Sequence, residues 1–274
     1  MNIKDLILYA SGIVLLLTGC EKEIDFDYID IEPLTVIEAN LTPEGIVVAI
    51  TETTPMAEPM NQLRLTDATV TLADLDKGTA ITLQTDSTGN YVDSTPGIAG
   101  HRYRLSVERN GNTHEAETVM FAATDIVSAE LNWISMPYDE VAVFQGQFLD
   151  DSSTHGDCYW VKLYRNGKIY KWGEIDDRGA TDGLVTYFTF TSRKDTDQED
   201  DEDVLYDGDI LTFTVSPVTR EMHSYLEALS NDSNGPAMFT GPRCLGYFMA
   251  SSPTSVSIIF HPDEIPSFQK QDKL

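Results

Sequence analysis

Two Asn-Gly turns between runs of alternating residues are the strongest constraint on how this chain can fold. Asn110-Gly111 and Asn166-Gly167 each lie between two segments in which apolar and polar residues alternate. Both central residues of a type I′ turn need positive φ angles, which Asn and Gly adopt readily, so each dipeptide predicts a tight β-hairpin. A chain built from such hairpins is expected to form antiparallel sheets.

Strand-like alternation recurs along most of the sequence. β-branched and aromatic residues at every second position are typical of strands with one face in a core. In the N-terminal part, we expect strands at 35–41, 46–50, 68–72, 80–83, 89–91 and 103–107. In the C-terminal part, we expect them at 141–148, 159–165, 168–172, 186–190, 210–215 and 255–260. This spacing predicts an all-β protein, with a β-sandwich at 33–122, a second β-rich domain at 123–262 and a tail at 263–274.

One segment departs from the strand pattern and predicts a short helix near residues 217–229. Ser216 can cap a helix, and Pro217 suits the first helical position. Apolar residues then fall on one face at helical spacing: Val218, Met222, Tyr225, Leu226 and Leu229. We expect this face to pack on a sheet, and we interpret it as core rather than as a ligand-binding stripe.

The N-terminus carries an export signal of the lipoprotein type. An apolar run leads to Leu17-Thr18-Gly19-Cys20, and the small residues before the cysteine favour cleavage between Gly19 and Cys20. The run is too short for a membrane-spanning helix, which needs roughly 20 apolar residues. We therefore expect residues 1–19 to be a signal peptide and Cys20 to carry acyl chains that hold the protein to a membrane. The alternative is an ordinary signal peptide or anchor that contains a cysteine by chance.

The chain is strongly acidic, with 45 acidic and 18 basic residues and a net charge of −27. This charge excludes a nucleic-acid groove, which needs clustered Lys and Arg. Residues 20–32 hold six acids and predict an extended tether, and residues 195–209 hold nine acids and no base. No cofactor is expected apart from calcium, whose preferred oxygen ligands are offered by Asp195, Asp197, Glu199 and Asp201. A solvated hairpin tip is the alternative interpretation of that insert.

Aromatic residues gather on the second predicted hairpin. The candidates for stacking on a sugar or a peptide are Tyr159, Trp160, Tyr164, Tyr170 and Trp172. Strand alternation places Tyr159, Val161 and Leu163 on one side. It places Trp160, Lys162 and Tyr164 on the other side. Only one of these two sets can face solvent if the other is buried.

Two cysteines remain once Cys20 is lipidated. Outside the cytoplasm, Cys158 and Cys244 can form a disulfide within the second domain or stay as free thiols, and their spacing does not decide between the two.

The residues offer no catalytic constellation. The sequence has no Gly-x-Ser-x-Gly elbow, no His-Glu-x-x-His helix and no phosphate-binding loop of the Walker type. The five histidines are scattered, and paired carboxylates are too abundant in so acidic a chain to mark a glycosidase. We therefore expect a protein that is not an enzyme.

Several short segments resemble one family of bacterial lipoproteins. They are the lipoprotein box, Val36–Gly45, Gly89–Tyr91, Gly100–Leu105 and Leu245–Ser252. In this order they are similar to a family of Bacteroidetes outer-membrane lipoproteins, domain of unknown function 4249. The resemblance implies an N-terminal immunoglobulin-like β-sandwich, a second β-sandwich or barrel-like domain, and genes that often lie beside those of TonB-dependent transporters. It implies no catalytic residues.

Two classes of function follow from these expectations. The first is a surface-exposed outer-membrane lipoprotein, anchored through Cys20, that binds a glycan or peptide as an accessory partner of a TonB-dependent transporter. The second is a structural or adhesive module of the cell surface without a nutrient ligand.

Overall fold

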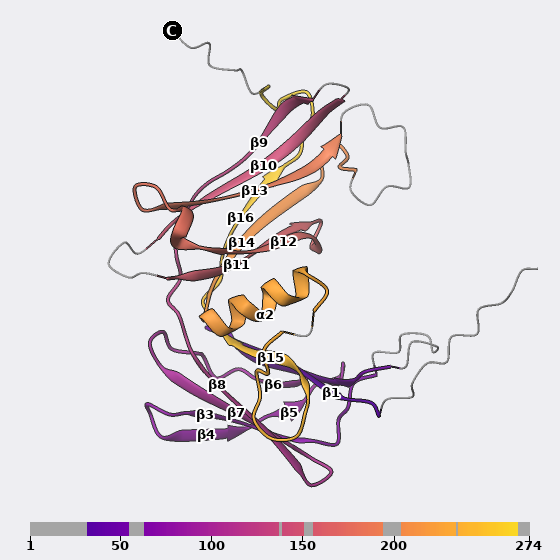
Figure 1. Cartoon of the computed structure of the whole chain (residues 1–274), viewed down its shortest axis with the longest axis vertical. Helices are drawn as coiled ribbons and strands as arrows, with labels where there is room; N and C mark the ends of the chain where they lie inside the picture. The colour runs from indigo at the N-terminus through magenta and orange to yellow at the C-terminus, as the bar shows by residue number, and fades with distance from the viewer. Residues whose placement is uncertain are drawn as a thin grey trace, which may run out of the picture. The chain divides into compact units, whose positions relative to one another are not determined.

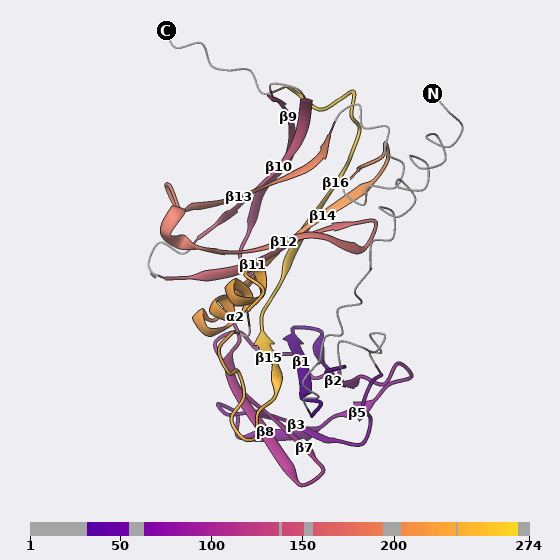
Figure 2. The same cartoon turned by 45° about the vertical axis from the view of Figure 1, so that its right-hand side comes forward.

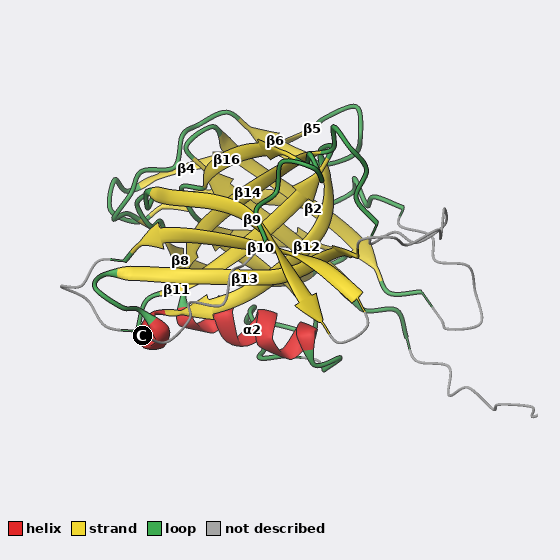
Figure 3. Cartoon of the chain, turned by 90° about the horizontal axis from the view of Figure 1, so that it is seen from above, coloured by secondary structure: helices red, strands yellow, loops and turns green. Residues whose placement is uncertain are grey.

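The computed structural model describes residues 32–54, 63–136, 139–150, 156–193, 204–233 and 235–267. Pro33–Thr53 and Asn61–Leu274 form one compact unit. Strands dominate the described residues, and the all-β prediction is confirmed (Figure 3). Residues 1–31, with the predicted signal peptide, Cys20 and nearly all of the predicted tether, lie outside the described residues, as do residues 268–274 of the predicted tail. The four acids predicted to bind calcium also lie outside them: Asp195, Asp197, Glu199 and Asp201.

Two sheets form the first β-sandwich (Figure 1). One sheet has the order β15-β1-β2-β6-β5, with β1 (Thr35–Thr42), β2 (Gly45–Glu52), β5 (Gln84–Thr85), β6 (Tyr91–Asp93) and β15 (Leu245–Ala250). The other has the order β4-β3-β7-β8, with β3 (Thr69–Asp74), β4 (Thr79–Thr82), β7 (Arg102–Arg109) and β8 (Asn112–Val119). Alternate residues of these strands are fully buried between the sheets, among them Ile37, Val48 and Leu105.

Strand β15 overturns part of the predicted domain division. The sequence places residues 245–250 in the second domain, but β15 pairs in parallel with β1 of the first sandwich, with Ile37 opposite Gly246. Nearly every residue of β15 is buried, so its sequence lacks the alternation that reveals a half-exposed strand. Gly246 has a φ of 104° and lies against the backbone of Ile37, where a side chain does not fit.

Two further sheets form the second β-sandwich. One has the order β13-β10-β9, with β9 (Ile126–Met136), β10 (Asp139–Leu149) and β13 (Leu184–Arg193). The other has the order β12-β11-β14-β16, with β11 (Cys158–Arg165), β12 (Lys168–Asp176), β14 (Ile210–Val218) and β16 (Thr254–Ile259). A short 3₁₀ helix, η1 (Asp177–Gly179), follows β12. The core between the sheets contains Phe144, Leu163 and Phe213.

Both Asn-Gly turns have the predicted geometry. The φ angles are 51° and 77° at Asn110 and Gly111, and 49° and 80° at Asn166 and Gly167. These turns join β7 to β8 and β11 to β12, so both hairpin predictions are confirmed.

The helix α2 (Arg220–Ser230) begins three residues later than the sequence predicts. Ser216 and Pro217 belong to β14, which stays paired with β11 up to Val218. The neighbouring strand β16 ends its pairing at Val215, so Pro217 lies where β14 is an edge and its missing N–H is tolerated. The hydroxyl of Thr219 caps the helix by accepting the N–H of Met222 at 3.1 Å.

One face of α2 is buried against strands. Met222 and Leu226 form a cluster with Cys158, Val218 and residues of β15. Figures 1 and 2 show α2 between β11 and β15, both of which it contacts. The prediction that the apolar face packs on a sheet is confirmed, but Leu229, expected on that face, is 44% exposed.

Candidate functional site

The predicted alternation along β11 is confirmed. Tyr159 is 4% exposed, and Val161 and Leu163 beside it are fully buried in the second core. Burial and the nearby Asp150 carboxylate raise the pKa of Tyr159, whose hydroxyl donates to that carboxylate at 2.7 Å. Tyr170 also packs against this core. Two of the five aromatic candidates therefore turn toward the interior.

The other three candidates belong to a different environment. Trp160 and Tyr164 are half-buried on the opposite face of β11, and Trp172 of β12 lies directly opposite Lys162. We call this group the Lys162 face and define it by its members from three adjacent strands: Trp160, Lys162, Tyr164, Trp172 and Thr214.

Aromatic rings surround one end of the Lys162 face. The ring of Trp160 meets Trp172 edge-on with centroids 6.4 Å apart, and it meets Tyr247 of β15 at 5.9 Å. Tyr225 of α2 lies 5.8 Å from Tyr247. Burial raises the pKa of Tyr247 to about 12, so this phenol stays neutral. The buried Nε1–H of Trp160 has no hydrogen-bond partner in the described part of the chain.

Lys162 lies at the centre of the Lys162 face, and no negative partner for it is found among the described residues. Its Nζ lies 3.4 Å from the centroid of the Trp160 ring, a close cation–π contact. Burial alone lowers the pKa of Lys162 to about 8, and none of the described acids pairs with it. At neutral pH the ammonium group is therefore still mostly charged, although it is half-buried.

The absence of a counter-charge is unusual in so acidic a chain. Acids outnumber bases 45 to 18, and several arginines each lie in an ion pair. They are Arg102, Arg104, Arg109, Arg165 and Arg178. A buried charge without a partner costs free energy, whereas an acid at a neighbouring position would have compensated for it.

Hydroxyl groups lie at the edge of the Lys162 face formed by β14. Thr214 lies opposite Lys162 in the sheet, and its Oγ1 lies 2.8 Å from Oγ of Ser255. Thr212 and Ser257 form the next such pair at 2.9 Å. A cation flanked by aromatic rings and hydroxyls has the chemistry to bind a carboxylate whose remainder carries a ring or apolar surface.

A cavity of about 290 Å³ lies beside the buried face of β11. It is lined by residues 121–124, by residues 157–159 and by Pro217 and Val218. Three acids lie close together near it, because the carboxylate oxygens of Asp150, Asp157 and Asp177 are all within 4.8 Å of one another. Such oxygens suit a hard cation. Acid clusters are expected in a chain of this charge, however, so this group is less specific than the unpaired Lys162.

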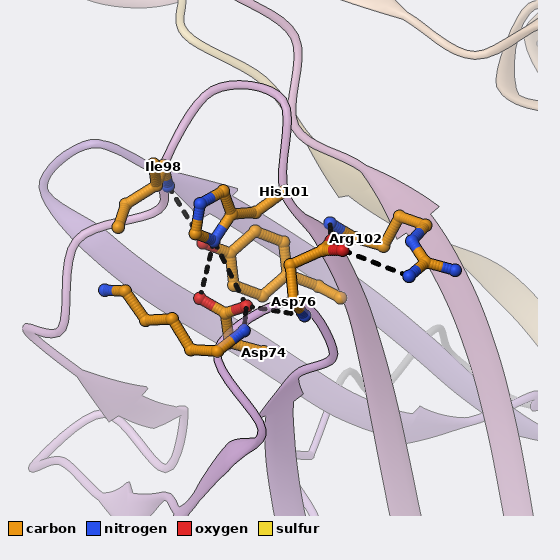
Figure 4. Close-up of polar contacts among 7 residues, drawn as sticks. Asp74, Asp76, Ile98, His101 and Arg102 are labelled. Carbon is orange, nitrogen blue, oxygen red and sulfur yellow. Dashed lines mark hydrogen bonds and ion pairs between the residues drawn. The ribbon is translucent and has the colours of Figure 1, made fainter.

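A polar cluster in the first sandwich has a structural role (Figure 4). Asp74, which is 8% exposed, accepts the backbone N–H of Lys77 at 2.9 Å and faces Nδ1 of His101 at 2.9 Å. Burial acts to raise the pKa of Asp74, but these hydrogen bonds outweigh it and the pKa is lowered. Asp76 pairs with Arg102, so the cluster ties the turn after β3 to the start of β7.

Of the two states that the sequence leaves open for Cys158 and Cys244, the structure shows free thiols. Cys158 is buried in the cluster under α2, whereas Cys244 packs against the core of the first sandwich. The two cysteines thus pack in different hydrophobic clusters.

Sequence reasoning found three members of the Lys162 face but did not assign Lys162 itself. Its position was predicted by alternation, yet the lack of a counter-charge appears only when the strands on both sides are placed. Tyr247, nearly 90 residues away in sequence, reaches Trp160 because β15 joins the first sandwich.

Comparisons with known proteins agree with the expected family. A family profile described as Domain of unknown function (DUF4249) matches residues 21–256. No curated protein matches the chain. A similar solved structure is a two fibronectin type-III domain segment from chicken tenascin, at 10% identity and a TM-score of 0.22, covering 84% of this chain and 100% of that chain. That likeness is too weak to bear on function. Among the described residues, no helix has the length and apolar character to cross a bilayer.

Proposed function

The chain belongs to the family described as Domain of unknown function (DUF4249), and on that premise we propose that it is a non-enzymatic lipoprotein that binds a ligand at the cell surface. In this proposal, acyl chains on Cys20 anchor it in the outer membrane, and it acts as an accessory partner of a TonB-dependent transporter. The ligand is a glycan or peptide that carries a carboxylate.

The observation that supports ligand binding is Lys162. Its ammonium group lies over the ring of Trp160, beside Trp172 in the sheet, and none of the described acids compensates its charge. A bound carboxylate would supply the missing partner and accept charge-assisted hydrogen bonds. The rings of Trp160 and Trp172 would contact the apolar part of the ligand.

The observation that supports surface anchoring is the sequence around Cys20. The lipoprotein box precedes an acidic tether, and a net charge of −27 disfavours adhesion of the folded body to anionic lipid. The acyl chains are then the membrane attachment, with about 0.8 kcal/mol contributed by each buried methylene group.

The experiment is mild crosslinking in a native host followed by affinity purification of the membrane fraction. We expect a TonB-dependent transporter to be recovered with the wild-type chain and lost with Cys20→Ser. Recovery of no membrane partner, under conditions that retain known transporter complexes, would favour the structural or adhesive module instead. Mass spectrometry of the mature protein should show an acylated Cys20 as its first residue.

A further inference from the structure

The outer face of the sheet β13-β10-β9 carries two exposed phenylalanines. Phe188 is 66% exposed and Phe190 is 52% exposed, both on β13. Tyr187, the residue before Phe188, turns inward and stacks on Phe213 with centroids 6.0 Å apart. The two exposed rings therefore lie on one side of the strand, two residues apart, which corresponds to about 7 Å along it.

Polar side chains lie beside these rings on the neighbouring strands. Phe188 is opposite Gln145, which is opposite Glu130, and Phe190 is opposite Val143, which is opposite Asn132. In the next row, Ser128, Gln147 and Thr186 are joined by two hydrogen bonds of 3.2 Å. We call these three rows the Phe188 face: Ser128, Glu130, Asn132, Val143, Gln145, Gln147, Thr186, Phe188 and Phe190.

The Phe188 face is almost uncharged in a strongly acidic chain. Glu130 is its only charged residue, whereas Asp, Glu, Lys and Arg make up 23% of the sequence and give a net charge of −27. Its hydrogen-bonding groups are amides and hydroxyls, which both donate and accept. Within the described part of the chain, the side chains of Asn132 and Gln145 make no hydrogen bond. A ligand that matches this chemistry is neutral and rich in hydroxyl groups.

We propose that the Phe188 face binds a neutral polysaccharide, whose sugar rings stack on Phe188 and Phe190 while their hydroxyls bond to the amides. Two rings on a regular strand form a flat platform, which suits an extended chain of sugars rather than a single small molecule in a pocket. This binding is independent of Lys162, which belongs to the other sheet of the sandwich. A second copy of this chain, docked through the same two rings, is the competing occupant.

Affinity electrophoresis of the full-length chain in mild detergent tests the proposal, with dextran, mannan, xylan and laminarin as the neutral probes. At least one polysaccharide should retard the wild-type chain. The double variant F188A/F190A should bind it about tenfold more weakly or worse, as expected for the loss of two stacked rings. Ile259→Ala is the matched control, because Ile259 is 55% exposed on β16 of the other sheet, and it should bind like the wild type.

Three results would overturn the proposal. They are retardation by none of the four polysaccharides, equal retardation of F188A/F190A, and a dimer in sedimentation that F188A/F190A abolishes while no sugar binds. Circular dichroism establishes that the variants are folded. Lys162→Met should leave the retardation unchanged, which separates a failure at the Phe188 face from a failure at the Lys162 face.

Discussion

Replacing Lys162 by methionine should stabilise the ligand-free protein. Burial lowers the pKa of Lys162 from its ordinary value of 10.5 to about 8. That difference corresponds to roughly 3 kcal/mol of free energy by which folding disfavours the charged form. The cation–π contact with Trp160 offsets about 1 kcal/mol of this cost. Lys162→Met should therefore raise the free energy of unfolding at pH 7 by about 2 kcal/mol.

The gain should depend on pH in a defined direction. The cost of burying the charge is present in full below pH 8, because the lysine is protonated in both the folded and the unfolded chain. Between about pH 8 and 10.5 the folded chain releases the proton while the unfolded chain keeps it, so the wild type becomes more stable. The advantage of Lys162→Met should accordingly shrink across this range.

Urea denaturation followed by circular dichroism at pH 7 and pH 10 measures both effects. Lys168→Met is the matched control, because Lys168 at the start of β12 is exposed, and it should change the stability by less than about 0.5 kcal/mol. A neutral or destabilising effect of Lys162→Met at pH 7 would refute the interpretation of Lys162 as an uncompensated charge. A stabilising loss of this lysine would instead be typical of a residue kept for function.

Three further predictions concern the remaining features. Gly246→Ala should lower the free energy of unfolding in urea by about 3 kcal/mol, because Gly246 has a φ of 104° and the new methyl group would collide with the carbonyl of Ile37. A change below about 0.5 kcal/mol would contradict the close packing of β15. In a Cys20→Ser chain, Cys158 and Cys244 should react slowly with a thiol reagent at pH 8, because burial raises the pKa of both thiols to about 11. Denaturation without reductant should expose two thiols, and finding none would demonstrate a disulfide. Asp74→Asn should lower the free energy of unfolding by about 1 kcal/mol at pH 7 and by less as the pH falls, because the lowered pKa of Asp74 gives stability above pH 3.8 that is lost below it. Equal acid unfolding profiles of the wild type and the variant would argue against this role.

Local chemistry made much of the fold predictable. The Asn-Gly turns and the alternation beside them identify both hairpins, because the φ angles and the burial of every second residue are set by neighbours in sequence. β15 was not predicted from the sequence because it is buried on both faces and pairs with a strand about 200 residues earlier. The helix start was wrong because pairing of Pro217 with β11 extends β14, and this tertiary contact overrides a favourable local signal.

The functional faces were predictable only in part. Alternation places Lys162 with Trp160 and Tyr164, but only the assembled sheets show that no described acid lies beside it. On β13 both alternating sets contain an aromatic residue, so the sequence does not tell whether Tyr187 or Phe188 faces the core. That choice depends on the packing of Phe213 against Tyr187 across the sandwich.

Calorimetric titration with an oligogalacturonate and with its neutral methyl ester decides whether the Lys162 face binds carboxylates. At physiological salt and pH 6.5, the acid should bind and the ester should not. Affinity should fall about tenfold at pH 9, where roughly one Lys162 in ten remains protonated if its pKa is about 8. Lys162→Met should abolish the heat, whereas equal binding of acid and ester, or unchanged binding to Lys162→Met, would contradict the proposed role of this lysine.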